Sequence, residues 1–324
     1  MSDDSRVRAA AIDCGTNSIR LLIADVDTAS GTVEDVTRVM EIVRLGQGVD
    51  RLGWFAPEAL ERTLDATARF GRLCEEAGVE RLRFVATSAT RDAANRNVFL
   101  DGVRDRLGVE AEVIDGLEEA HLSFAGARSS LAADLPGPFL CVDLGGGSTE
   151  LVLGGERAEH AFSMDVGCVR ITERHLRSDP PTRAEVRAAA SDVDAVLDVA
   201  ARRVPLGEAR TLVGLAGSIT TVTAAALGLE RYDPRRVDGA RVPFDQMLQA
   251  CRALWEATRA ARARLGFMHP GRVDVIGAGA LVFSRVLLRV RDAVAEAGAD
   301  LSWVVAAEHD ILDGIALAAA GVVR

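Results

Sequence analysis

The sequence predicts an α/β protein built from two similar lobes. Three observations point to this class. The length of 324 residues, with 48% hydrophobic residues, exceeds the size at which a single hydrophobic core usually stops growing. Segments with the patterns of β-strands and α-helices alternate along the chain. Part of the first half also recurs in the second half, as expected for a duplicated lobe.

The repeat is clearest in two short segments. DCGTNSIRLLI (residues 13–23) corresponds to DLGGGSTELVL (143–153), and LRFVATSAT (82–90) corresponds to LVGLAGSIT (212–220) at the same offset of 130 residues. A third correspondence, between EVIDGLEEA and DVIGAGALV, has a larger offset. It predicts an insertion of about thirty residues in the second half.

Each half begins with an apolar strand, a tight turn of small residues and a second apolar strand, which is the pattern of a β-hairpin. Asp13 and Asp143 end the first strand of each hairpin. Apolar residues near helical spacing predict helices over Pro57–Gly78, Pro181–Val204 and Phe244–Leu265. We expect these helices to cover the sheets.

The lobe boundaries follow from the same pattern. We expect a first lobe over residues 1–127 and a second over 128–309, divided in the loop-like segment 127–138. The insertion is expected near 231–268. A terminal helix over 310–324 either packs back on the first lobe or belongs to the second.

The charge composition excludes several functions. A net charge of −10 argues against a nucleic acid or an anionic membrane as partner, because both need a basic surface. All 38 basic residues are Arg, and the chain has no Lys. A lysine-containing P-loop and Schiff-base chemistry are therefore excluded. Phosphate would have to be held by Arg, backbone N–H groups or a metal.

Other features predict a cytoplasmic protein. The five cysteines are scattered and form no CxxC pair, which is typical of reduced thiols. The N-terminal segment lacks the apolar stretch of a signal peptide. The uncharged run Thr211–Leu229 is long enough to span a membrane, but its centre, GSITTVT, is polar. This run is better explained as a buried strand, a turn and a helix.

The two hairpin turns are candidates for phosphate binding. The residues after Asp13 and Asp143 are small enough for backbone N–H groups to approach an anion. An Asp beside phosphate is repulsive unless a divalent cation or a water shell lies between them, which favours Mg²⁺ or Mn²⁺. Alternatively, these Asp side chains cap their own turns. In the first turn, Asn17 and Ser18 are also ordinary hairpin residues.

The sequence resembles the exopolyphosphatase and guanosine pentaphosphate phosphohydrolase family, within the superfamily of actin, sugar kinases and heat-shock proteins. The resemblance extends from Ala11 to Ala280. The motifs that carry it are AIDCGTNSIRLLI, ATSATRDA, EVIDGLEEAHLSF, CVDLGGGSTELVLG, DVGCVRITE, LAGSITT and PGRVDVIGAGA. It implies two actin-like (ribonuclease H-like) lobes, each a mixed β-sheet with flanking helices, and an active site in the cleft between them. It also implies a homodimer.

The resemblance assigns roles to particular residues. Glu119 would activate the attacking water, with Glu150 as a second catalytic carboxylate. The metal ligands would be Asp13, Asp143 and Glu150. The residues assigned to phosphate are Asn17, Ser18, Arg91, Gly145, Gly146, Gly147, Ser148, Gly217 and Ser218.

Each assignment has a structural alternative. Glu119 could be a solvated glutamate that is stabilised by the start of its helix. Arg91 could form a surface salt bridge. Arg20, which matches Glu150 in the repeat, could be a surface guanidinium.

The sequence and the resemblance together predict a Mg²⁺-dependent exopolyphosphatase that removes terminal phosphate from inorganic polyphosphate. The short chain leaves short polyphosphates open as substrates. The alternatives are a guanosine pentaphosphate 5′-phosphohydrolase, a kinase of the same superfamily, and a non-catalytic sensor of phosphate or nucleotide.

Overall fold

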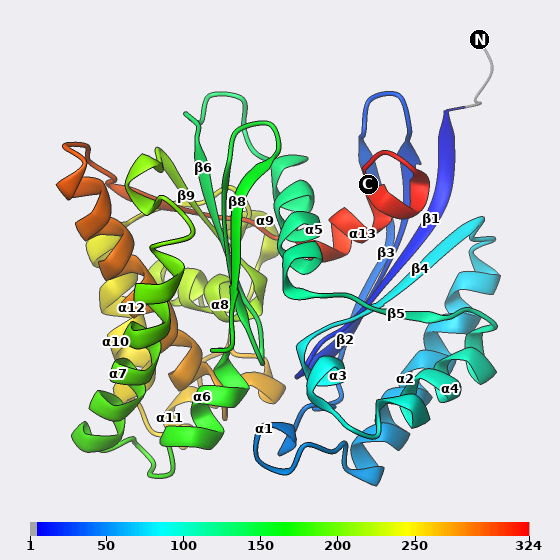
Figure 1. Ribbon diagram of the computed structural model, residues 1–324, viewed down its shortest axis with the longest axis horizontal. Coiled ribbons are helices and arrows are strands. Elements are labelled where there is room, and N and C mark those ends of the chain that lie inside the picture. The colour runs from blue at the N-terminus through cyan, green and yellow to red at the C-terminus, as the bar shows by residue number, and fades with distance from the viewer. Residues whose placement is uncertain (1–4, 324) are drawn as a thin grey trace. The chain divides into compact units, whose positions relative to one another are not determined.

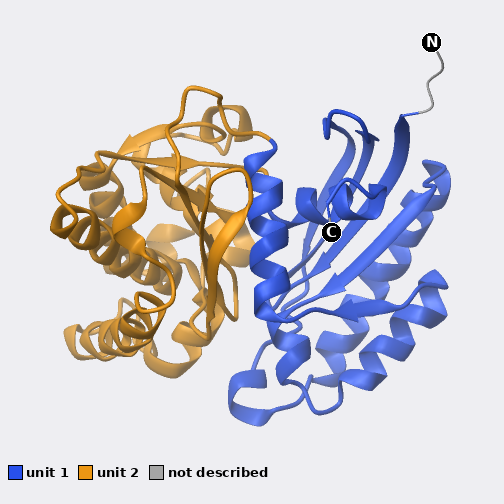
Figure 2. Cartoon of the chain, turned by 45° about the horizontal axis from the view of Figure 1, so that its top comes forward, with its two compact units in different colours: residues 1–129, 310–324 blue, residues 130–309 orange. Residues whose placement is uncertain are grey.

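The computed structural model describes residues 5–323, in which strands and helices alternate (Figure 1). The chain divides into two compact units (Figure 2). Unit 1 comprises residues 1–129 and 310–324, and unit 2 comprises residues 130–309. The predicted α/β class is confirmed.

Unit 1 contains a five-stranded sheet with the order β3-β2-β1-β4-β5. Its strands are β1 Arg6–Cys14, β2 Ser18–Asp27, β3 Val33–Ile42, β4 Arg81–Ala86 and β5 Ala111–Val113. Strands β1, β2 and β3 are antiparallel, whereas β4 and β5 run parallel to β1. The sheet is therefore mixed, as predicted.

Helices cover both faces of this sheet. They are α1 Val49–Leu52, α2 Pro57–Glu76, α3 Ser88–Asp92, α4 Arg96–Leu107, α5 Gly116–Arg128 and α13 Ile311–Ala320. Successive residues of β1 alternate between two cores. Ile12 joins the core that contains Phe70 and Phe99 of α2 and α4, and Ala11 joins the core that contains Ile315 of α13. By this alternation, Asp13 lies on the α13 face.

Unit 2 contains a six-stranded sheet with the order β10-β11-β9-β6-β7-β8. Its strands are β6 Phe139–Leu144, β7 Thr149–Gly154, β8 Ala158–Met164, β9 Thr211–Leu215, β10 Arg241–Pro243 and β11 Trp303–Ala306. The β6–β7–β8 part is antiparallel, and β9 is parallel to both β6 and β11.

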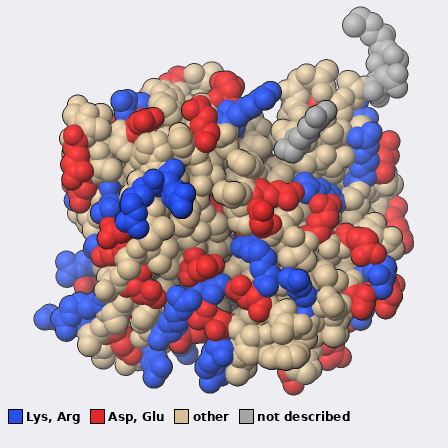
Figure 3. All heavy atoms as spheres, in the orientation of Figure 1, with Lys and Arg blue, Asp and Glu red and all other residues tan. Residues whose placement is uncertain are grey.

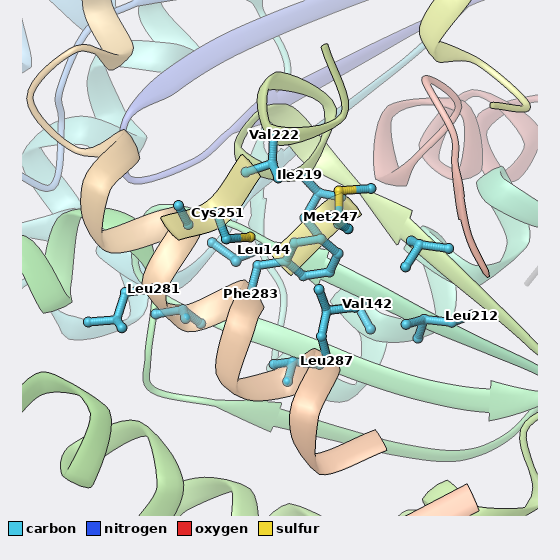
Figure 4. Packing of buried hydrophobic residues seen from close by; sticks show 14 of the residues in the cluster. Val142, Leu144, Leu212, Ile219, Val222, Met247, Cys251, Leu281, Phe283 and Leu287 are labelled. Atoms are coloured by element: carbon cyan, nitrogen blue, oxygen red, sulfur yellow. The ribbon is translucent and has the colours of Figure 1, made fainter. Parts of the chain in front are cut away.

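One large hydrophobic core joins this sheet to its helices. The helices are α6 Cys168–His175, α7 Arg183–Ala200, α8 Ala216–Ala226, α9 Pro234–Val237, α10 Phe244–Glu256, α11 Arg259–Arg262 and α12 Ile276–Glu296. Short 3₁₀ turns occur at Leu206–Glu208 and Pro270–Arg272. Val142 and Leu144 of β6 pack with Phe283 and Leu287 of α12 (Figure 4). The alternate residues, Cys141 and Asp143, lie on the other face of β6.

The strand orders of the two units match. Strands β3-β2-β1-β4-β5 correspond to β8-β7-β6-β9-β11, and both predicted hairpins are confirmed. The third predicted correspondence is wrong, because Asp274 does not begin a strand. The counterpart of β5 is β11, which is followed by α13. Residues 274–282, which the prediction had matched to β5 and the start of α5, lead directly into helix α12 without a strand.

Two other segments differ in detail from the prediction. The helix expected over Phe244–Leu265 ends at Glu256, because Ala257 is extended and Thr258 caps the separate helix α11. The run Thr211–Leu229 forms β9 followed directly by α8, without the predicted turn. None of the helices within residues 5–323 has the length and hydrophobicity needed to cross a membrane.

Candidate active site

Glu119 lies in the first turn of α5. The helix is capped by Asp115, whose carboxylate accepts hydrogen bonds from the N–H groups of Leu117 and Glu118, both at 2.9 Å. The two adjacent glutamates then diverge. Glu118 is half-exposed and pairs with Arg83, whereas Glu119 is buried. Only Glu119 is therefore held in a water-poor environment.

The surroundings of Glu119 tune its acidity. Burial raises the pKa of Glu119 to about 7, although the charge and hydrogen bond of Arg91 and a hydrogen bond from Thr87 oppose the rise. The negative charge of Asp13 adds to it. A carboxyl group with a pKa near neutrality can accept a proton from water and release it again. The simple surface role considered for Glu119 does not fit this burial.

Arg91 is the cation beside this carboxylate. Its Nη1 donates to Glu119 Oε2 at 2.8 Å and to the carbonyl of Ile114 at 3.0 Å. The residues at positions 5–323 offer no hydrogen-bond partner to Nε and Nη2. Three N–H donors, one on Nε and two on Nη2, therefore remain for phosphoryl oxygens. The ion pair of Arg91 is with the candidate base and not with a surface carboxylate.

Asp13 forms a buried ion-pair network in unit 1. Its Oδ2 accepts hydrogen bonds from Arg20 Nε at 2.9 Å and from Nη2 at 2.6 Å. Arg20 Nη1 donates to Asp310, the N-cap of α13. Burial raises the pKa of Asp13 despite the charge of Arg20. Arg20 is thus a mostly buried bridge between a strand end and a helix start.

The turn between β1 and β2 contains the predicted phosphate residues Asn17 and Ser18. The Asn17 carbonyl accepts hydrogen bonds from the N–H groups of Val43 and Arg44. Thr16, between Gly15 and Asn17, has a buried hydroxyl without a hydrogen-bond partner among the described residues. An unsatisfied buried hydroxyl is costly and is expected where a ligand or water completes the site.

Asp143 and Glu150 are directly opposite each other on β6 and β7. The same register places Asp13 opposite Arg20 in the first hairpin. Both unit 2 carboxylates are buried, and Glu150 Oε1 accepts a hydrogen bond from Ser163 at 2.7 Å. Like charges directly opposite on a sheet destabilise it unless a cation compensates. In the first hairpin the residue opposite Asp13 is the cation Arg20, so no such repulsion arises there.

These two carboxylates fit a magnesium ion. Within residues 5–323, no three His, Cys, Asp or Glu side chains converge into a complete metal-binding set. Mg²⁺ does not need one, because it commonly retains several waters and binds one or two carboxylates together with substrate phosphate. Asp13, the third predicted ligand, is bound to Arg20, so a cation would have to compete with that guanidinium.

The turn Gly145–Ser148 is anchored through its carbonyl groups. The carbonyls of Gly145 and Gly146 accept hydrogen bonds from backbone N–H groups at the start of α6. The Gly147 carbonyl accepts a hydrogen bond from Arg170 Nε at 2.8 Å. For the N–H groups of Gly146, Gly147 and Ser148, the described residues provide no acceptor. This arrangement leaves three successive donors for an anion.

None of the three glycines Gly145–Gly147 has a positive φ angle. A left-handed backbone therefore does not explain their presence, and close approach by a ligand remains the better explanation.

Gly217 and Ser218 lie at the start of α8. The preceding residue, Ala216, has a φ of 65°, an unfavourable conformation for a residue with a side chain. A Cβ at Gly217 would lie 2.0 Å from Arg272 Nη2, and one at Gly279 would lie 2.7 Å from Ser218 Oγ. Gly217 is thus covered by a guanidinium, an arrangement suited to holding an anion at a helix N-terminus.

Sequence reasoning missed Asp310, Arg272 and Thr16 as members of these clusters. Asp310 is 290 residues from Arg20, and Arg272, which is also distant from Gly217 in the sequence, contacts it only in the folded chain. The position of Asp310 immediately before an apolar helical run is a capping signal that could have marked it.

The matching sheets, each with an Asp at the tip of its first hairpin, define an actin-like α/β protein. Within that class the chain belongs to the Ppx/GppA phosphatase family, whose sequence model matches residues 22–296. Exopolyphosphatase 2 of Mycobacterium tuberculosis is 52% identical over 321 residues, which cover 97% of this chain and 99% of that protein.

Solved structures agree with this assignment. The crystal structure of a protein described as exopolyphosphatase-like is 50% identical, with a TM-score of 0.94, and the match covers 97% of this chain and 98% of that one. The Ppx/GppA family member of Aquifex aeolicus is 28% identical, with a TM-score of 0.76 and 97% coverage of both chains. The resemblance inferred from the motifs is confirmed.

Proposed function

We propose that this protein is an exopolyphosphatase that hydrolyses the terminal phosphate of inorganic polyphosphate with the help of Mg²⁺ or Mn²⁺. The observation that carries the proposal is Glu119, a buried carboxyl with a pKa of about 7 that is held at 2.8 Å by Arg91. Such a group is suited to general-base catalysis. The 52% identity to Exopolyphosphatase 2 over nearly the whole chain supports polyphosphate as the substrate.

In the proposed reaction, Glu119 accepts a proton as a water oxygen attacks the terminal phosphorus. The bond from this phosphorus to its bridging oxygen breaks, and orthophosphate and a chain shorter by one phosphate are released. Arg91 offers N–H donors to the charged phosphoryl oxygens. The N–H groups of Gly146, Gly147 and Ser148 offer further donors.

Asp143 and Glu150 would hold the divalent cation, which when bound would neutralise negative charge on the phosphate oxygens. The chain's own contribution is to keep the two carboxylates in register and, through Ser163, to orient Glu150. Glu150→Gln keeps the shape and the Ser163 contact but removes one charge. We expect it to raise the Mg²⁺ concentration needed for half-maximal activity. An unchanged Mg²⁺ titration would exclude Glu150 as a ligand.

The test of the base uses two neighbouring glutamates. Glu119→Gln should lower kcat by about 10²- to 10⁴-fold, the usual contribution of a general base, while polyphosphate binding is largely retained. Glu118→Gln, the same change at a half-exposed ion pair, should stay near wild type. Equal activity of the two variants would contradict the assignment of Glu119.

Two further expectations belong to this proposal. A cytoplasmic location is supported by the five cysteines, which are all buried and unpaired. The homodimer stays a prediction from the family resemblance, and light scattering of the purified protein would test it.

A further inference from the structure

Helix α6 orients the backbone of the glycine turn. The carbonyl of Gly145 accepts a hydrogen bond from the Cys168 N–H at 3.0 Å, and the carbonyl of Gly146 accepts one from the Val169 N–H at 2.9 Å. These N–H groups belong to the first turn of α6, where a helix has no acceptors of its own. The turn therefore supplies the missing acceptors of the helix, and the helix fixes two peptide planes of the turn.

The start of α6 packs closely against this turn. Gly167 directly precedes the helix, and a Cβ there would lie 2.4 Å from the carbonyl oxygen of Gly146 and 2.6 Å from the backbone nitrogen of Gly147. Only a residue without a side chain lets the two backbones approach this closely. The helix start is thus in direct contact with the turn that it orients.

The third peptide plane of the turn is fixed by a side chain. Within residues 5–323, the Gly147 carbonyl accepts no backbone hydrogen bond, and its donor is Nε of Arg170 at 2.8 Å. Arg170 is half-buried in the first turn of α6. Because the backbone of glycine is permissive, the peptide between Gly147 and Ser148 could rotate without this hydrogen bond. Arg170 therefore holds this peptide in its observed orientation.

The orientation of the three peptide planes decides where their N–H groups point. The peptide bonds of the turn are trans, and in a planar trans peptide the N–H points opposite to the C=O. Because the three carbonyls face α6, the N–H groups of Gly146, Gly147 and Ser148 point away from it. The Ser148 N–H shares a peptide plane with the Gly147 carbonyl, so its direction depends on Arg170.

We propose that Arg170 is a positioning residue, which aims the Ser148 N–H at a phosphoryl oxygen of the substrate by donating from Nε to the Gly147 carbonyl. The inference rests on the proposed function and adds a residue that acts through the turn. The feature that matters is the N–H donor at the Nε position and not the positive charge. Arg170 thus differs from Arg91, whose remaining donors contact phosphate directly in the proposed reaction.

The alternative is an effect of charge. Arginines occur across the face of the protein shown in Figure 3, interspersed with acidic side chains, so a positive charge alone does not single out Arg170. Two substitutions separate the roles. Glutamine and methionine both lack the charge, but only glutamine has an N–H donor. Its amide nitrogen stands as many bonds from Cα as Nε of arginine does, and so does the terminal methyl of methionine.

The experiment compares Arg170→Gln and Arg170→Met with the control Arg174→Met. Arg174 lies one turn further along α6 and pairs with Asp192 at 3.4 Å. Its substitution removes the same charge from the same helix and leaves the hydrogen bond to Gly147 in place. The readouts are kcat and KM for tripolyphosphate, and the dissociation constant of tripolyphosphate after each change is added to Glu119→Gln. All are measured at a temperature at which thermal unfolding shows the variants to be folded.

Arg170→Met should lower kcat/KM by roughly 10- to 100-fold, somewhat less than the about 10²- to 10³-fold loss for removing an oxyanion-hole donor, because the released peptide can still adopt its native orientation part of the time. Tripolyphosphate binding should weaken in the same variant. Arg170→Gln, which keeps the donor, should recover most of this loss. Arg174→Met should behave like wild type.

Two results would overturn the proposal. An equal loss in Arg170→Gln and Arg170→Met would mean that the charge is the feature that matters. Wild-type values in Arg170→Met would mean that the turn keeps its orientation without Nε. If Arg170→Met does not fold, Arg170→Gln alone decides, because a tenfold loss in a variant that keeps the donor contradicts the proposal.

Failure of the proposed function is distinguishable from failure of this inference. In that case wild type would release no phosphate from tripolyphosphate, yet tighter binding of tripolyphosphate by Arg170→Gln than by Arg170→Met would still support the role of Arg170. Absence of tripolyphosphate binding to wild type would overturn both.

Discussion

The pKa of Glu119 gives a prediction that links stability to activity. In Glu119→Gln, the carboxyl is replaced by an amide that does not titrate. The pKa of Glu119 is raised from 4.5 to about 7 by burial, so the folded protein binds this proton more tightly than the unfolded chain does. The free energy of unfolding of wild type should therefore fall as the pH rises from 4.5 to 7 and then level off.

The shift sets the size of the effect. A difference of this size between the folded and unfolded pKa corresponds to about 3 kcal/mol of stability, which wild type loses relative to Glu119→Gln across this pH window. The same group controls activity in the opposite direction, because only the ionised carboxylate is a base. Below pH 7, kcat/KM should fall about tenfold per pH unit.

The assay is urea unfolding of wild type, Glu119→Gln and Glu118→Gln at several pH values between 4.5 and 8, together with the pH profile of phosphate release. Glu118→Gln should keep the wild-type pH dependence of stability, since it changes a half-exposed side chain. A stability difference between wild type and Glu119→Gln that is constant with pH would refute the reasoning. So would an acidic limb of the rate profile far below neutrality.

Two further changes test the surroundings of the site. Gly126→Ala should destabilise the protein by about 1–3 kcal/mol or more, because a Cβ there would lie 1.8 Å from the backbone carbonyl of Asp310. Gly155→Ala is the control, because a Cβ at Gly155 would have no neighbouring atom closer than 3.6 Å. Equal thermal unfolding temperatures of the two variants would contradict the close packing of α5 and α13. Arg91→Met should move the acidic limb of activity to higher pH, because the charge of Arg91 lowers the pKa of Glu119. If the acidic limb of the pH–activity profile stays at the wild-type pH in Arg91→Met, the charge of Arg91 does not act on the pKa of Glu119.

The parts of the site that sequence could predict are local along the chain. The offset of 130 residues aligned Asp13 with Asp143 and Arg20 with Glu150. The strand register came only from the structure, which places Asp13 opposite Arg20 and Asp143 opposite Glu150. The role of Glu119 came from the family resemblance, since its sequence alone also fits a surface helix start.

The parts that sequence could not predict depend on distant contacts. Arg20 is held by Asp310 from the far end of the chain, and no local pattern connects the two residues. The parallel pairing of β11 with β9 was missed for the same reason. A short apolar strand such as β11 has only a weak pattern in the sequence. No local feature therefore excluded the incorrect match of residues 274–282 to residues 112–120.

The most direct test of the account is phosphate release with Mg²⁺ from long polyphosphate, short polyphosphate, guanosine pentaphosphate and ATP, with Glu119→Gln as the blank. The account predicts release of orthophosphate from polyphosphate by wild type and almost none from the variant. Release from none of these substrates, or equal release by Glu119→Gln, would contradict the claim that this protein is an exopolyphosphatase with Glu119 as its base.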